Sequence, residues 1–150
     1  MNPPARTPQE RKRDVLERLE NDVDLWVATA DPATGTPYLV PLSYRWDGST
    51  LLIATPRSNP TGLNIGANGM VRVGIGPTRD VVLIEGTARE LADDEVTVEE
   101  GDAFAAHTGF DPRELGAFAW FRIRPQLLQA WREANEIKGR DLMVDGEWVV

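Results

Sequence analysis

The chain has 150 residues, of which 41% are hydrophobic, enough for one globular domain with a substantial core. Its formal net charge of −8 and its pI of about 4.7 disfavour nucleic-acid binding, which needs a basic face for phosphate contacts. No apolar run approaches the roughly 20 residues that span a bilayer. We therefore expect neither a nucleic-acid partner nor a membrane partner. An anionic ligand would need local arginines and backbone amides, because the overall field repels it.

The sequence contains no cysteine. Disulfides, thiolate metal ligands and cysteine nucleophiles are therefore excluded, and the composition suits a reducing cytoplasm. The first residues, MNPPARTPQERKRD, lack the apolar segment of a signal peptide. We expect a cytoplasmic protein with a single domain over residues 1–150 and a loose N-terminal arm at 1–6.

The sequence TPQE indicates the start of a helix. Thr7 is expected to cap it, Pro8 to occupy its first turn and Glu10 to close a capping box. Apolar residues at helical spacing continue this helix to about Asn21.

Short apolar runs separated by turn sequences follow the helix. They predict strands at 25–30, 37–46 and 50–55, with Asp47-Gly48 as a hairpin turn between the last two. Such a succession is typical of an antiparallel meander.

The second half of the chain continues this pattern. We expect strands at 70–76 and 80–91, a helix over 93–109, and a long strand at 117–125 followed by the segment 126–131. A closing Asp-Gly hairpin completes the chain. Six or seven strands with two inserted helices predict a mainly β fold, an antiparallel barrel that is closed or half closed. A doubly wound parallel sheet is disfavoured, because strands and helices do not alternate regularly.

Several familiar sites are disfavoured by the residues present. His107 is the only histidine, so neither a zinc site nor a Ser-His-Asp triad is expected, and we interpret it as a helix-face residue. The segment GIGPTRD (74–80) lacks the third glycine of a dinucleotide-binding turn and leads into a strand. The acidic run at 93–100 is interpreted as a solvated helix face.

The segment TPRSNPTGLNIG (55–66) gathers hydrogen-bonding side chains in a turn directly after a buried strand. Arg57 can bind a phosphate through two parallel hydrogen bonds. A helix that begins here would add free amides and a favourable dipole. Further side-chain donors are Ser58, Asn59, Thr61 and Asn64. The segment is therefore a candidate phosphate site, and the alternative is a polar loop with a helix cap.

Pro41 lies within the predicted strand 37–46. A proline is expected to interrupt the strand and to leave its backbone unpaired on one side. Such an edge can offer amide and carbonyl groups to the rim of a flat ligand.

Residues 25–65, LWVATADPATGTPYLVPLSYRWDGSTLLIATPRSNPTGLNI, resemble the first half of the pyridoxamine 5′-phosphate oxidase-like split-barrel proteins. That superfamily includes flavin- and deazaflavin-dependent reductases. The resemblance extends through MVRVGIG and VVLIEGTA to WFRIRPQLLQAWRE and covers most of residues 10–135.

The resemblance implies a split-barrel homodimer with two flavin sites at the subunit interface. Relatives usually carry a lysine, and often an arginine, where Thr61 and Leu63 stand here, so Arg57 would bear most of the phosphate binding. Trp131 lies in a segment that often reaches the neighbouring subunit's cofactor in relatives, and its alternative role is a core tryptophan that plugs the barrel. The residues implied at the flavin are Val40, Pro41 and Leu42 at the ring through their backbone, Ala54 and Thr55 near the ribityl chain, and Arg57, Ser58, Thr61 and Asn64 at the phosphate.

The resemblance also implies a flavin-type oxidoreductase that transfers a hydride to or from a small-molecule substrate. FMN is the expected cofactor, and the deazaflavin coenzyme F-420 is the alternative. In such proteins the cofactor does the hydride chemistry, and this agrees with the lack of an evident acid–base pair, so no catalytic residue is predicted. A second hypothesis is a flavin- or tetrapyrrole-binding module without turnover. A true pyridoxamine-phosphate oxidase is the third, disfavoured because the basic cluster for a substrate phosphate is missing.

Overall fold

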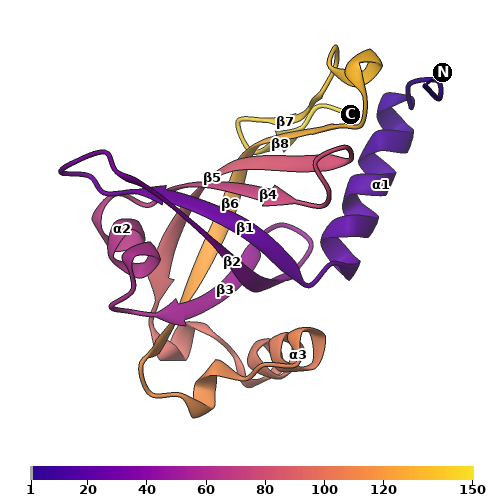
Figure 1. Ribbon diagram of the computed structural model, residues 1–150. Helices are drawn as coiled ribbons and strands as arrows, with labels where there is room; N and C mark the ends of the chain where they lie inside the picture. The colour runs from indigo at the N-terminus through magenta and orange to yellow at the C-terminus, as the bar shows by residue number, and fades with distance from the viewer. Residues whose placement is uncertain (1) are drawn as a thin grey trace.

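The computed structural model describes residues 2–150. Eight antiparallel strands form one sheet in the order β3-β2-β1-β4-β5-β6-β7-β8, and β3 also pairs with β6, which closes the first six strands into a barrel (Figure 1). The expected mainly β antiparallel split barrel is thus confirmed. The helices and strands are α1 (Pro8–Asn21), β1 (Asp24–Ala30), β2 (Pro37–Trp46), β3 (Leu51–Pro56), α2 (Pro60–Asn68), β4 (Met70–Ile75), β5 (Val81–Leu91), α3 (Val98–Thr108), β6 (Phe118–Trp131), β7 (Asp141–Val144) and β8 (Glu147–Trp148).

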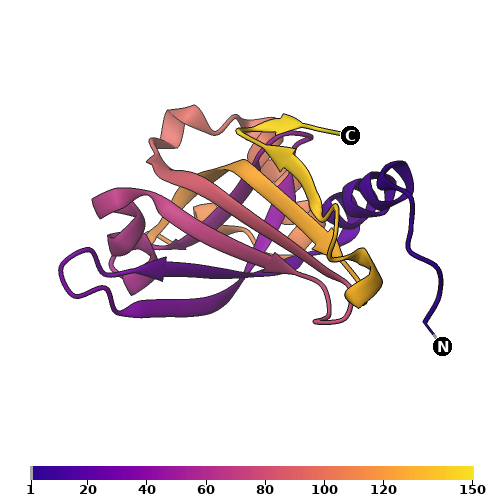
Figure 2. The same ribbon diagram turned by 90° about the horizontal axis from the view of Figure 1, so that it is seen from above.

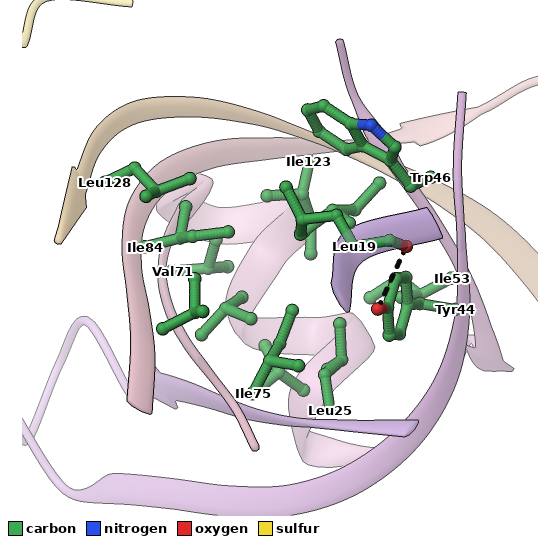
Figure 3. Packing of buried hydrophobic residues seen from close by; sticks show 14 of the residues in the cluster. Leu19, Leu25, Tyr44, Trp46, Ile53, Val71, Ile75, Ile84, Ile123 and Leu128 are labelled. Carbon is green, nitrogen blue, oxygen red and sulfur yellow. Dashed lines mark hydrogen bonds between the residues drawn. The ribbon is translucent and has the colours of Figure 1, made fainter. Parts of the chain in front are cut away.

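The capping box predicted for α1 is present. The hydroxyl of Thr7 accepts from the amide of Glu10 at 3.1 Å, and the Glu10 carboxylate accepts from the Thr7 amide at 2.8 Å. Leu19 of α1 points into the barrel, and its carbonyl accepts a 3.1 Å hydrogen bond from the buried hydroxyl of Tyr44 (Figure 3). The helix therefore contributes to the core as well as flanking it.

The barrel wall separates two hydrophobic clusters. Alternating residues such as Leu51 and Ile53 point inward and join the main core. Leu52 and Ala54 point to the other face, where they pack with Phe104 of α3 in a second cluster. This division follows from the two-residue period of a strand.

β6 is one strand from Phe118 to Trp131, although the sequence pattern predicts a strand that ends at residue 125. The pairing with β5 shifts beside Pro125, which lies opposite Gly86, while Leu127 lies opposite Glu85. This β-bulge lets the strand pass through a proline without ending.

The helix predicted over 93–109 is divided. Asp93–Glu95 form a short 3-10 turn, and α3 begins only at Val98. Thr97 causes the division, because its side chain accepts from the amide of Glu100 at 3.0 Å and caps a new helix there. The closing hairpin β7–β8 forms as predicted, with positive φ angles of 52° and 78° at its Asp145-Gly146 turn.

The arm expected to be loose at 1–6 is anchored at its last residue, and only its first residue, Met1, lies outside the described residues. The Arg6 guanidinium donates to both oxygens of the buried Glu136, at 2.8 and 3.0 Å. The two residues of this charge pair are 130 positions apart in the sequence. The same end of the molecule holds the C-terminal hairpin, which lies beside α1 (Figure 2), where Lys12 contacts the Trp148 ring.

Candidate functional site

The predicted phosphate segment forms the connection between β3 and α2. The amide of Arg57 donates to the carbonyl of Ala117 at 3.1 Å, and the amide of Asn59 donates to the carbonyl of Pro56 at 3.0 Å. The turn is therefore tight and anchored to the segment that leads into β6. The side chains of Arg57 and Ser58 are exposed.

α2 begins directly after this turn, with Pro60 in its first position. Asn59 stands at the N-cap, but its side chain makes no capping hydrogen bond within residues 2–150. Amides of a first turn that lack a side-chain cap attract anions. Gly62 packs against the turn, because a Cβ there would lie 2.8 Å from the carbonyl oxygen of Arg57. The start of α2 and the Arg57 turn therefore form one compact unit.

The side chains of Thr61 and Asn64 do not belong to the exposed surface of this turn. Both are buried, and the Asn64 amide donates to the hydroxyl of Thr29 on β1 at 3.0 Å. Asn64 thus holds α2 against the barrel wall. Arg57, Ser58 and Asn59 remain as the candidate phosphate residues with exposed side chains.

Arg57 is paired with an acid that the sequence analysis missed. Its Nε lies 3.2 Å from each carboxylate oxygen of Glu90, near the end of β5. The two side chains are 57% and 38% exposed, and an ion pair at such a site contributes only about 0–1 kcal/mol. A stronger anion can therefore displace the Glu90 carboxylate. A separation of 33 residues leaves no local sequence signal for the pair.

The edge predicted around Pro41 is present. Residues 37–43 of β2 pair with β1 alone in the described chain, whereas residues 44–46 pair with β3. The backbone at Val40, Pro41 and Leu42 is therefore unpaired on one side, as expected. Pro41 does not interrupt β2, however, but lies opposite Trp26 in a continuous strand. A proline is tolerated there because this part of β2 forms ladder hydrogen bonds on one side only. The place where β2 and β3 stop pairing is called the split here, and α2 packs against both strands beside it.

The outer face of β1, β4 and β5, together with the open part of β2, is a further candidate surface that was not predicted from the sequence. Trp26 and Leu39 are 51% and 59% exposed on this face. They line a shallow cavity of about 270 Å³, which adjoins another of about 340 Å³. Both cavities are lined by Arg72 and Glu85, which form an ion pair. A contiguous apolar patch of this kind marks an interaction surface. Its only sequence signal is that Trp26 lies between two inward-facing residues of β1.

The other predicted residues lie apart from the turn or inside the barrel wall. Thr55 is buried, and the side chain of Ala54 lies in the cluster beneath α3. Trp131 lies at the opposite end of β6 from Phe118, the residue that pairs beside the turn. The half-buried Trp131 ring has the guanidinium carbon of Arg140 6.0 Å from its centroid. The cofactor roles of Ala54, Thr55 and Trp131 stay predictions.

The remaining candidate polar side chain is the single histidine. His107 lies on α3, and its Nε2 is 2.8 Å from the carbonyl of Asp22, just beyond α1. Within the part of the chain that the structure describes, no group of three His, Cys, Asp or Glu side chains is placed to hold a metal ion. Among the helices of residues 2–150, none combines the length and the apolar character of a membrane span.

The sequence profile of the family described as "Pyridoxamine 5'-phosphate oxidase" matches residues 12–132, most of the chain and both sides of the split. No curated protein sequence matches the chain significantly.

Solved structures share the fold at low identity. An F420 reductase has a TM-score of 0.62 and 18% identity, covering 75% of this chain and 93% of its own. An FAD-binding protein from Mesorhizobium loti has a TM-score of 0.60 and 21% identity, covering 78% and 89%. The heme storage protein HutZ from Vibrio cholerae has a TM-score of 0.64 and 15% identity, covering 77% and 89%. These similarities support the fold alone.

Proposed function

Because the chain belongs to the pyridoxamine 5′-phosphate oxidase family, we propose that it is a dimeric flavin-type oxidoreductase. It transfers a hydride between a bound flavin, either FMN or the deazaflavin coenzyme F-420, and a small-molecule substrate. The proposal includes a cytoplasmic location, supported by the lack of cysteine. The observation that carries it is the uncapped start of α2 beside Arg57, next to the split between β2 and β3.

The residues at this turn fit the phosphate of such a cofactor. Arg57 and Ser58 offer exposed donors, and the first turn of α2 offers amides without a side-chain cap from the described residues. Arg57 is held by a weak surface pair with Glu90, so it can exchange that partner for a phosphate. These groups would bind and orient the tail of the cofactor.

The unpaired edge of β2 fits the ring. Val40, Pro41 and Leu42 have backbone groups that β3 does not pair, and such groups can fix a flat heterocycle in the plane of the sheet edge. The bound flavin would supply the hydride chemistry, and this chain's residues would position it and exclude water.

The homodimer in this proposal is supported by the outer face of the barrel. Trp26, Leu39 and Leu83 expose a contiguous apolar surface, and a second copy would remove it from water. In a dimer, Trp131 would have to reach the partner's site, because within one chain it lies far along β6 from Arg57.

A flavin- or tetrapyrrole-binding module without turnover is the alternative. Its support is the similarity of the fold to a protein described as a heme storage protein, together with the single cation at the turn.

The test is the identity and the reactivity of the bound molecule. One sample of the purified protein is denatured, and the small molecule that it releases is identified by mass spectrometry. A second, folded sample receives FMN or F-420 and is tested for hydride exchange with reduced nicotinamide and a panel of reducible substrates. A flavin or deazaflavin mass together with hydride transfer supports the proposal. A tetrapyrrole mass, or binding without any transfer, supports the module.

A further inference from the structure

We infer that Glu90 is a specificity-determining residue of the Arg57 turn, whose carboxylate disfavours a cofactor with a doubly charged phosphate monoester more than one with a singly charged phosphate diester. The inference rests on the proposed function, because it concerns the tail of the same cofactor.

The charges at the turn carry the argument. Arg57 is the only charged residue in the segment 55–66. Its guanidinium is shared between both oxygens of the Glu90 carboxylate, at 3.2 Å each. The pair is neutral as a whole, and Thr61 and Leu63 add no charge. A phosphate therefore meets one cation that already has an anionic partner.

A phosphate that takes the place of Glu90 at Arg57 leaves the carboxylate beside it. The backbone of Glu90 is fixed in β5 opposite Phe121, so its carboxylate stays within side-chain reach of the turn. Like charges a few ångströms apart repel in proportion to their product. A phosphate with two charges is therefore repelled about twice as strongly as a phosphate with one.

Cofactors of the flavin type differ in this charge. The phosphate monoester of FMN carries close to two negative charges at neutral pH, since its second pKa lies near 6. Each phosphate of FAD, and the phosphodiester of a deazaflavin coenzyme, carries one charge, and riboflavin carries none. Glu90 therefore lowers the affinity for FMN most and does not lower the affinity for riboflavin.

The experiment uses the full chain and measures the binding of riboflavin, FMN and FAD by quenching of flavin fluorescence. Glu90→Gln removes the charge and keeps the size of the side chain. Glu133→Gln is the matched control, because Glu133 also forms an exposed ion pair, with Arg79 at 3.0 Å. Arg79 precedes the start of β5 and Glu90 lies near its end, so the two sites are at opposite ends of that strand.

We expect Glu90→Gln to raise the affinity for FMN on the order of tenfold and that for FAD about threefold, with riboflavin unchanged. Glu133→Gln should change none of the three. An unchanged affinity for FMN in Glu90→Gln, or an equal rise for all three ligands, overturns the inference while the proposed function stands. If neither the wild type nor Glu90→Gln binds any of the three, and neither binds F-420 in the same assay, the proposed function fails and the inference with it.

Discussion

Asn64 of α2 donates a buried hydrogen bond of 3.0 Å to the hydroxyl of Thr29 on β1. This bond joins the helix that begins at the candidate phosphate site to the wall of the barrel. It explains why the side chain of Asn64, predicted to bind phosphate, is directed inward: its donor is already used by the fold.

Asn64→Ala should lower the free energy of unfolding by about 1–3 kcal/mol, because it leaves the Thr29 hydroxyl buried without its partner. Urea denaturation measures the change. In a double-mutant cycle with Thr29→Val, the combined loss should be smaller than the sum of the single losses. Additive losses would show that the two side chains are not coupled.

Gly62→Ala should destabilise the protein by about 1–3 kcal/mol, because the new methyl group would meet the carbonyl oxygen of Arg57 at 2.8 Å. It should also weaken flavin binding, since the turn and the start of α2 move apart. Gly66→Ala on the same helix is the control: nothing lies within 4 Å of its Cβ position, and it should stabilise the helix by about 0.5–1 kcal/mol. Equal effects at both glycines would contradict the close packing at Gly62.

Trp26→Glu should convert the proposed dimer into a monomer, because it places a charge in the middle of the apolar outer face. Light scattering coupled to size-exclusion chromatography measures the mass. Val98→Glu, at an exposed position on α3, is the control and should leave the mass unchanged. A wild-type protein that elutes as a monomer would refute the dimer.

Acid should destabilise the protein through Glu136. The hydrogen bond from the Arg6 side chain is the main cause that lowers the pKa of this buried carboxyl to about 2, from an ordinary value of 4.5. The Glu136 carboxylate takes up its proton at a lower pH in the folded state than in the unfolded state. Its stabilisation of the folded state is therefore complete above pH 4.5 and is lost as the pH falls toward 2. The loss is on the order of 3 kcal/mol.

Urea denaturation between pH 6 and pH 2.5 tests this expectation. In Glu136→Gln, the part of the pH dependence that falls between 4.5 and 2 should disappear, whereas Glu133→Gln should retain it. The same pH profile in Glu136→Gln and the wild type would show that another group is responsible.

Arg57→Ala should weaken FMN or FAD binding by about 1.5–3 kcal/mol, the range for a hydrogen bond to a charged group. Titration calorimetry measures the affinity, and Arg79→Ala, which also removes an exposed arginine from an ion pair, should leave it unchanged. An unaltered affinity in Arg57→Ala would remove the turn from the cofactor site.

The strands of the barrel are predictable because their pattern is local. Val71, Val73 and Ile75 are buried on one face of β4, as their two-residue spacing predicts. The passage of β6 through Pro125 is not predictable in this way, since the bulge depends on the register with Gly86 in another strand.

The candidate site likewise combines features set by the local sequence with features set by contacts between distant residues. The exposed turn at Arg57 and the unpaired edge at Pro41 could be predicted, because proline and glycine limit the backbone locally. The partner of Arg57 could not, since Glu90 meets it only after the barrel has closed. The inward direction of Asn64 likewise depends on Thr29, which lies on a different strand.

The two prolines of β2 have a consequence for assembly. Pro37 and Pro41 both lie in the half of β2 that β3 leaves uncovered. Prolines on an open edge prevent a foreign strand from continuing the ladder. Copies of this protein cannot join edge to edge into one extended sheet at this point. The unpaired edge of β2 therefore remains accessible to small molecules without acting as a site of polymerisation.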